Sequence, residues 1–258
     1  MKVIAFILAA GRGKRLGSLT LDKPKVLLEL DKNFTFLDYH VAILTRYGRI
    51  SPTNIYVVAG YKAKKVIVKA NTLGLKVIVN RSYNKHENMY SVYVTKKVTD
   101  KDSDTFIILN GDTIVHPKIL EIMLSGFMRV RNNTNNIALF AIDTNKILGE
   151  EEMKVLVRRG RIVRFGKDLS PQQAFGEYIG LSIYDNISYR KFLNSIEDYV
   201  KRGVTYVWYE IVLNSLVSTI DMIPVDVDSL PWIEVDTPED YARAKALYRD
   251  ILKDLLRP

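Results

Sequence analysis

Residues 3–17 read VIAFILAAGRGKRLG, and this segment carries most of the information on the fold. Residues 3–8 form a continuous apolar run of strand length, a pattern typical of a strand buried on both faces of a parallel sheet. Small residues then allow a tight turn, and the cations Arg12, Lys14 and Arg15 follow. Backbone N–H groups in such a turn bind anions, and arginine adds bidentate bonds to phosphate. The segment therefore predicts a phosphate-binding loop at the carboxyl end of the first strand.

This loop matches neither of two common nucleotide-binding motifs. It is not a Walker A loop, because no Gly-Lys-Ser/Thr closes it. It is not the dinucleotide fingerprint, because its glycine spacing is G-x-G-x-x-x-G and the second predicted strand ends at Val58-Ala59-Gly60 without an acid for a ribose. A tight glycine turn with a solvated basic face is the alternative. The order of strand, glycines, arginine and a later Pro24-Lys25 favours anion binding.

Apolar periodicity predicts the other elements of the first half, which alternate between strand and helix. The predicted strands cover residues 3–8, 55–59, 76–79 and 105–109, and the predicted helices cover 34–47, 66–73 and 89–98. This βαβαβ order predicts an α/β sandwich whose ligands bind at the carboxyl ends of the strands.

The second half departs from this alternation. Its patterns predict strands over 136–142, 154–158, 161–165, 178–184 and 222–225, and helices over 188–202, 207–218 and from Thr237-Pro238 onward. The second and third of these strands form a hairpin that turns at Arg159-Gly160. Because no linker, repeat or low-complexity segment interrupts the sequence, we expect one domain over residues 1–258 with an elaborated second half.

Composition narrows the class of protein. The chain has 258 residues, of which 47% are hydrophobic and 26% charged, as in an ordinary globular protein. It has 0 Cys, which removes disulfides, cysteine nucleophiles and thiolate zinc sites and fits a reducing compartment. No apolar run reaches the roughly 18 residues of a membrane helix, so we expect a cytoplasmic protein without membrane insertion. The net charge of +9 suits nucleic acids and small polyphosphates alike.

The opening segment resembles a family, the nucleotidyltransferases that couple an NTP to a sugar phosphate or an alcohol phosphate. Their pattern LAAGxGxRL, followed by PK, stands here at residues 8–16 and at Pro24-Lys25. The resemblance implies an α/β fold of the nucleotide-diphospho-sugar transferase type, with a Rossmann-like, mixed and mostly parallel sheet flanked by helices. It also implies a nucleotide-binding half at 1–135 and an acceptor-binding half at 136–258.

The resemblance assigns roles to individual residues of these motifs. The loop backbone holds the base and phosphates, which implies nucleotide binding by Leu8, Ala9, Ala10, Gly11 and Gly13. Three cations are the expected catalytic residues: Arg15 grips the NTP phosphates, Lys25 neutralises the reacting phosphoryl group, and Lys167 contacts the acceptor's phosphate. The match at Lys167 is looser, because sugar pyrophosphorylases usually show Glu-Lys-Pro there, and an exposed turn lysine is the alternative.

Two acidic motifs predict a Mg²⁺ site. In Leu109-Asn110-Gly111-Asp112 the acid follows an apolar strand, where it is well placed to hold Mg²⁺ against phosphate oxygens, with Gly111 beside the nucleotide. Glu234 and Asp236 are two residues apart, so on a strand they would share one face. The resemblance implies Asp236 as the second ligand, with Glu234 nearby. The alternatives are a simple turn at Asp112 and a helix-capping role for Asp236.

The segment 80–92 is the expected site of base recognition, with nucleotide contacts from Asn88 and Ser91. Its Asn-Met-Tyr-Ser run at 88–91 resembles the cytidylyltransferases that activate phosphocholine or inositol 1-phosphate. Residues 154–169 resemble the soluble cytidylyltransferase part of archaeal enzymes of di-inositol phosphate synthesis. Those enzymes often carry a membrane transferase domain, which we do not expect here.

Four residues are the expected acceptor contacts: Glu177, Tyr209, Glu210 and Trp232. Glu177 lies between glycines at the start of a strand, where it binds acceptor hydroxyls or an ammonium, or is a polar residue at a sheet edge. The aromatic residues around Trp208-Tyr209-Glu210 and Trp232 form either a box for a quaternary ammonium, through cation–π contacts, or part of the core.

These features predict a Mg²⁺-dependent cytidylyltransferase that transfers CMP from CTP to an alcohol phosphate such as inositol 1-phosphate or phosphocholine. The expected partners are these small molecules, and no nucleic acid is expected. The sequence leaves open whether the protein forms a homo-oligomer. A sugar-1-phosphate pyrophosphorylase using UTP or dTTP is the alternative within the class. The alternative from another class is a non-catalytic regulatory protein or an RNA-binding protein. The sequence disfavours it, because the predicted acids and cations are all present and no RNA-stacking motif occurs. The three histidines show no metal-ligand spacing and no G-x-S-x-G elbow occurs, so hydrolase functions lack support.

Overall fold

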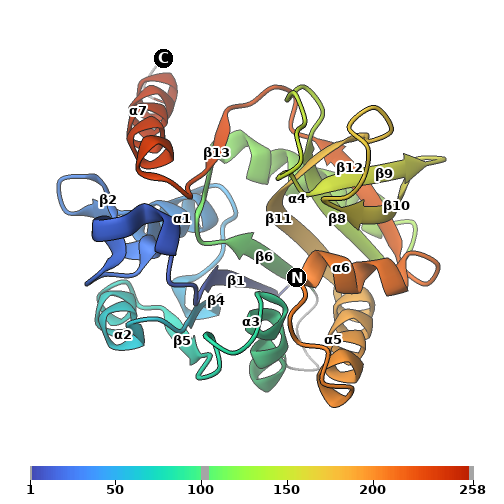
Figure 1. The fold of residues 1–258 in the computed structure, drawn as a ribbon. Helices are drawn as coiled ribbons and strands as arrows, with labels where there is room; N and C mark the ends of the chain where they lie inside the picture. The colour runs from blue at the N-terminus through green and yellow to red at the C-terminus, as the bar shows by residue number, and fades with distance from the viewer. Residues whose placement is uncertain (1, 100–104, 256–258) are drawn as a thin grey trace.

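The computed structural model describes residues 2–99 and 105–255, and these residues build a central sheet of nine strands (Figure 1). The strand order is β10-β9-β11-β6-β1-β4-β5, with β8 paired to β11 and β12 paired to β8. The strands are β1 (Val3–Ala9), β4 (Ile55–Ala59), β5 (Lys76–Val79), β6 (Thr105–Asn110), β8 (Ile137–Asp143), β9 (Lys154–Arg158), β10 (Arg161–Gly166), β11 (Gly176–Asp185) and β12 (Asp221–Asp226).

The first half of the chain supplies a parallel block, β5-β4-β1-β6. Each of its four strands was predicted from the apolar pattern. In β1, Ala5 and Ile7 pack into the core on one face while Ile4 and Phe6 pack into the core on the other. This two-sided burial confirms the interpretation of the apolar run. Because the four strands are parallel, their carboxyl ends lie along one edge of the sheet.

β11 joins the two halves of the sheet. It is buried along its whole length and pairs antiparallel with β6, β8 and β9. The hairpin β9–β10 turns at Arg159 (φ 50°) and Gly160 (φ 73°), the left-handed values that a tight hairpin turn requires. The expected Rossmann-like mixed sheet, with an elaborated second half, is confirmed.

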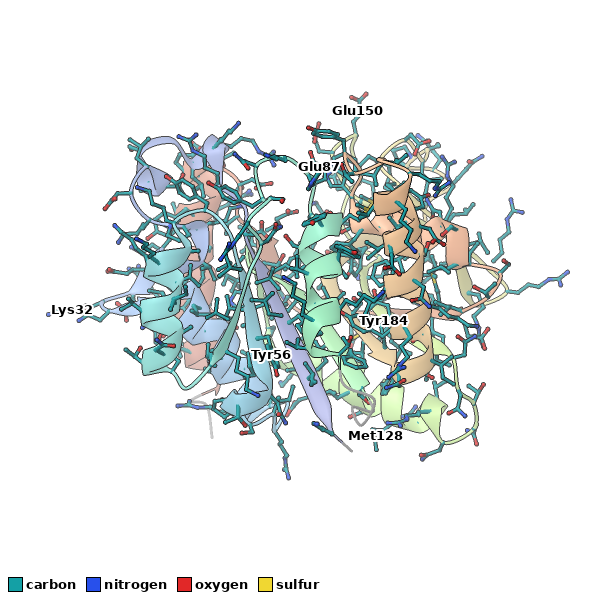
Figure 2. All side chains as sticks on the ribbon, turned by 90° about the horizontal axis from the view of Figure 1, so that it is seen from below. Lys32, Tyr56, Glu87, Met128, Glu150 and Tyr184 are labelled. Atoms are coloured by element: carbon teal, nitrogen blue, oxygen red, sulfur yellow. The ribbon has the colours of Figure 1, made fainter. Side chains whose placement is uncertain are left out.

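Helices cover both faces of the sheet. The core on one face contains buried residues of α1 (Phe36–Arg46), α2 (Ala63–Thr72), α4 (Pro117–Arg131) and α7 (Pro238–Leu255). The core on the other contains residues of α3 (Met89–Tyr93), α5 (Asn186–Lys201) and α6 (Tyr209–Leu213). Figure 2 shows α3 and α5 side by side in front of the sheet. Among the described residues, no helix is both long enough and apolar enough to cross a membrane.

Helix boundaries differ from the prediction where local chemistry intervenes. α1 begins at Phe36 because Thr35 caps it: the Thr35 hydroxyl accepts from Asp38 N–H, and Asp38 accepts from Thr35 N–H. The predicted helices 89–98 and 207–218 each divide into an α-helical turn followed by a 3₁₀ segment, Val94–Val98 and Asn214–Leu216. Further 3₁₀ segments are Lys14–Thr20, Lys25–Leu27 and Pro52–Asn54.

Two small sheets and one long helix were not predicted. The helix is α4, and the first small sheet pairs β2 (Glu29–Asp31) with β3 (Phe34–Thr35). The second pairs β7 (Thr113–Val115) antiparallel with β13 (Trp232–Glu234), with Glu234 opposite Thr113. This pairing brings the acids near residues 112 and 236 together across more than a hundred positions of sequence.

Candidate active site

The predicted phosphate-binding loop follows β1 directly and is held at both ends. Ala10 C=O accepts a hydrogen bond from Tyr61 N–H at 2.9 Å, which ties the loop to the end of β4. Gly13 has φ 64°, a left-handed value, and its carbonyl accepts from the Thr20 hydroxyl at 2.8 Å. A Cβ on Gly111 would lie 2.7 Å from Leu8 O, so glycine lets the β6–β7 turn approach the loop. The result is a fixed backbone cradle at the carboxyl ends of the strands.

The loop opens onto a pocket of about 880 Å³, within the range of small-molecule sites. Nine of the predicted site residues line it: Leu8, Ala9, Gly11, Gly13, Arg15, Lys25, Gly111, Asp112 and Asp236. The rest of the wall was not assigned individually, and it includes four aromatic rings, those of Tyr61, Tyr83, His86 and Tyr206. We call this cavity the nucleotide pocket.

Three acids meet at one end of the nucleotide pocket. Asp112 follows β6, while Glu234 ends β13 and Asp236 comes just after it. One carboxylate oxygen from each lies within 4.8 Å of the others. The pKa of Glu234 is raised to about 8, first because its carboxylate loses hydration and then because Asp112 and Asp236 repel a further negative charge. Three crowded oxygen donors are the ligand set that Mg²⁺ prefers, so the residues fit a divalent cation.

Two cations balance these acids. Lys25 Nζ lies 3.0 Å from Asp112 Oδ2 and 2.9 Å from Asp236 Oδ1. Arg15 Nη2 lies 2.6 Å from the other Asp236 oxygen. Burial by itself would lower the pKa of Lys25, but the attraction of Asp112 and Asp236 outweighs it and the pKa is raised. Lys25 is therefore a fully charged ammonium that bridges the two predicted metal ligands.

A second pocket, of about 510 Å³, opens on the other side of the acids. We call it the acceptor pocket. It contains the predicted residues Asn88, Lys167, Glu177, Glu210, Trp232 and Glu234. Arg15 and Asp236 line both pockets, so the two cavities meet at the acids and their cations. Figure 2 shows Glu87, next to Asn88, and Glu150, in the loop before β9, at the same end of the molecule, with Met128 at the other end.

Four predicted residues have positions that the motifs did not specify. Asn88, expected beside the base, lines the acceptor pocket, where its side-chain oxygen accepts from Tyr209 N–H at 2.9 Å. Ala10 and Ser91 line neither pocket, and Ser91 is buried with its hydroxyl 3.2 Å from Asn80 Nδ2. Tyr209 is fully buried, and its hydroxyl donates to Asn110 Oδ1 at 3.1 Å. Tyr209 thus holds Asn110, which lines the acceptor pocket, whereas Ser91 contacts a residue outside both pockets.

Glu210 presents a buried carboxyl to the acceptor pocket. The residue is 4% exposed, and its Oε2 has no hydrogen-bond partner among the described residues. Burial raises the pKa of Glu210 to about 7. A hydroxyl group of a ligand would satisfy this oxygen, since an unpaired buried acceptor is costly.

We expect Glu210→Gln to raise the melting temperature at about pH 8, with a gain that shrinks toward about pH 5. The pKa of the folded carboxyl is about 7 against an ordinary 4.5, so the folded state holds the proton more tightly. Wild-type stability therefore falls as the pH rises from the lower to the higher value, and glutamine removes this loss. Thermal melts at both pH values measure it, at about 2–4 °C per kcal/mol for a chain of this size. An equal difference at both pH values would contradict the assignment.

Lys146 is the main acceptor-pocket residue that sequence reasoning missed. It lies in the loop between β8 and β9, and its Nζ is 2.8 Å from Glu177 Oε2 and 3.3 Å from Glu152 Oε1. The same Nζ lies 5.4 Å from the centre of the Trp232 ring. No periodicity marks this loop, so the sequence held no signal for the contact. Tyr61, in the nucleotide pocket, was accessible to prediction, because it lies two residues after the end of the parallel strand β4.

Comparisons with known proteins find a family model and several similar proteins. The family model of the MobA-like NTP transferase domain matches residues 5–148. A bifunctional IPC transferase and DIPP synthase from Aquifex aeolicus is 25% identical over 244 residues, which cover 93% of this chain and 50% of that protein. The chain thus spans about half the length of this relative.

Two further proteins are similar over nearly the whole chain. The choline-phosphate cytidylyltransferase of Streptococcus pneumoniae is 21% identical over 252 residues, which cover 95% of this chain and 98% of that protein. The solved structure of the inositol-1-phosphate CTP transferase from T. maritima has a TM-score of 0.75 at 24% identity, and the match covers 97% of this chain and 96% of that one. At this identity the structural likeness establishes a common fold.

Proposed function

The chain belongs to the family of MobA-like NTP transferase domains, and from that premise we propose that it is a cytidylyltransferase that transfers CMP from CTP to an alcohol phosphate. The observation that carries the proposal is the junction of the two pockets. Arg15 and Asp236 line both cavities, and Lys25 and Asp112 lie beside them. A nucleotide in one pocket and a phosphate in the other would meet at this cluster.

The reaction needs positioning and charge neutralisation. An oxygen of the acceptor's phosphate attacks the α-phosphorus of CTP in line, the new P–O bond forms, and the bond to pyrophosphate breaks. The attacking oxygen is already anionic, so no general base is required. The backbone N–H groups of the glycine loop bind phosphate oxygens, and Arg15, Lys25 and Lys167 spread their positive charge over the reacting groups.

The acids complete the charge arrangement. Asp112 and Asp236, with Glu234 beside them, would hold Mg²⁺, which when bound neutralises phosphate charge and orients the reacting phosphoryl group. Lys25 and Arg15 contact these acids in the structure. Both side chains lie at the edge of the nucleotide pocket, so the incoming phosphates offer them alternative anionic partners.

We further propose that residues 1–135 bind the nucleotide and residues 136–258 the acceptor, with a few exchanges between the halves. Asn88 of the first half lines the acceptor pocket, while Tyr206 of the second half lines the nucleotide pocket. The backbone joins these regions, since Glu87 N–H donates to Thr205 C=O at 3.0 Å. We also propose a cytoplasmic location, with which a sequence of 0 Cys is compatible.

We expect pyrophosphate release with CTP and an alcohol phosphate, and little with UTP or dTTP. A screen of the three nucleotides against inositol 1-phosphate, phosphocholine, glycerol phosphate and glucose 1-phosphate measures it directly. Isothermal titration with each nucleotide gives the affinity without turnover. Tighter binding of UTP, together with release only from glucose 1-phosphate, would replace the proposal with a sugar-1-phosphate pyrophosphorylase.

A further inference from the structure

One end of the acceptor pocket has the parts of an ammonium-binding cage. The face of the Trp232 ring and the carboxylates of Glu177 and Glu152 converge on one point. An aromatic face with nearby carboxylates is the environment that recognises alkylammonium groups. The point is taken by the chain itself, because Lys146 Nζ lies 5.4 Å from the ring centre and 2.8 Å from Glu177.

The cage is held by neighbouring groups and does not depend on Lys146 for its shape. The Trp232 indole N–H donates to Asp143 Oδ2 at 2.7 Å, which fixes the plane of the ring. Glu177 is 4% exposed and lies on β11, paired with Asp143 and Lys154 of the adjacent strands. Glu152 Oε2 accepts from Gly149 N–H at 2.8 Å. The fully buried Lys154 anchors this loop by donating to Gly149 C=O at 2.7 Å.

The second tryptophan of the pocket is covered in the same way. Lys167 Nζ lies 4.8 Å from the centre of the Trp208 ring and 3.2 Å from Glu151. The sequence contains 2 Trp, so each tryptophan of this protein has a lysine ammonium on one face. A ligand with a cationic head that approached either tryptophan ring would therefore meet a lysine ammonium of the same charge.

We propose that Lys146 is a specificity-determining residue: its ammonium fills the cage of Trp232, Glu177 and Glu152, excludes acceptors with a cationic head and selects acceptors rich in hydroxyl groups. This inference rests on the proposed function, because it narrows the class of alcohol phosphate. A second ammonium in the cage would stand within about 4 Å of the first, and like charges at that distance repel strongly in a partly buried site.

A polyol fits the groups that remain. The Lys146 ammonium has three N–H donors and forms ion pairs with Glu177 and Glu152, and it can also donate to a ligand hydroxyl oxygen. The Oε2 of Glu210, which lacks a hydrogen-bond partner among the described residues, accepts from a ligand hydroxyl. The pocket thus offers both a donor and an acceptor to an uncharged, polyhydroxylated body whose phosphate points toward Arg15.

The test titrates tetramethylammonium into the protein without nucleotide and follows tryptophan fluorescence in a Trp208→Phe background, where Trp232 is the one reporter. We expect no saturable change with Lys146 present. Lys146→Ala leaves Glu177 and Glu152 unbalanced and should bind tetramethylammonium at least tenfold more tightly. Lys146→Arg, which keeps a cation on the ring, is the matched control and should behave as the parent.

Two further measurements make the result decisive. Glu152→Gln added to Lys146→Ala should abolish most of the gained affinity, because it removes one carboxylate of the cage. Lys146→Ala should also weaken inositol 1-phosphate binding about tenfold by titration. If the alanine variant has a lowered melting temperature, both measurements are repeated with Lys146→Gln, whose side chain is similar in length to lysine but uncharged.

Saturable binding of tetramethylammonium with Lys146 in place, or no gain in either variant, overturns the inference. The readout needs neither CTP nor turnover. Failure of the proposed function would appear separately, as absent pyrophosphate release.

Discussion

Asp112→Asn and Asp236→Asn are each expected to lower turnover by two or more orders of magnitude at saturating CTP and acceptor, with folding little changed. Asparagine keeps the shape of each side chain but removes one carboxylate from the three that lie within 4.8 Å of one another. A hundredfold loss corresponds to about 2.7 kcal/mol of barrier reduction, a common contribution of one metal-ligand charge. Pyrophosphate release with a Mg²⁺ titration is the measurement.

Folding should survive because each variant leaves Lys25 one carboxylate partner. A melting temperature near that of the wild type separates lost chemistry from lost structure. Glu177→Gln is the control, since Glu177 lines the acceptor pocket and not the nucleotide pocket. This substitution should weaken acceptor affinity while CTP binding stays nearly intact. Near-normal turnover in both asparagine variants would contradict the assignment of these acids as metal ligands. The enzymatic proposal would then lose its main support.

The parallel block of the sheet was predictable because its signals are local. A strand buried on two faces is apolar along most of its length, and β1 and residues 106–109 of β6 show such runs. The tight β9–β10 turn is equally local, since Arg159-Gly160 supplies the two left-handed residues. α4 also carries a local signal, with proline at its first position and apolar residues spaced along one face, so this helix was predictable from the sequence as well.

The pairing of the short strands β7 and β13 was beyond sequence reasoning for a physical reason. Each has three residues, and their pairing depends on partners more than a hundred positions apart. The acids could be named from their motifs, but their mutual distance could not. The bridge that Lys25 forms between Asp112 and Asp236 depends on this pairing as well.

The acceptor pocket was the least predictable part of the site. Glu210 and Tyr209 are adjacent, yet Glu210 faces the pocket while Tyr209 is buried in the core, and composition does not distinguish the two. The tryptophans suggested a box for a quaternary ammonium, but the lysines over Trp208 and Trp232 come from other segments of the chain. Contacts of this kind require the three-dimensional arrangement.

Lys25→Met is expected to lower turnover by about a hundredfold to a thousandfold, a range typical of losing one preorganised charge beside a reacting phosphate. The same change should lower the melting temperature of the metal-free protein. Lys25 is mostly buried, with a side chain 11% exposed, and methionine fills a similar volume without the ammonium. Asp112 and Asp236 would then face each other without the cation that now bridges them.

Magnesium should reverse that loss of stability more strongly in the variant than in the wild type. In the wild type a divalent cation competes with the Lys25 ammonium for the same two carboxylates, whereas in Lys25→Met this competitor is gone and Arg15 remains beside Asp236 alone. A ligand that binds only the folded state raises stability by an amount that grows with its affinity, so tighter metal binding gives a larger shift. Thermal melts with and without MgCl₂ measure the shift for both proteins. Lys23→Met is the matched control, because Lys23 lies two residues away and its nearest acid is Glu29, at 3.9 Å. An equal magnesium shift in all three proteins would mean that Lys25 and the metal do not share the carboxylates, and the charge arrangement proposed for the reaction would be wrong.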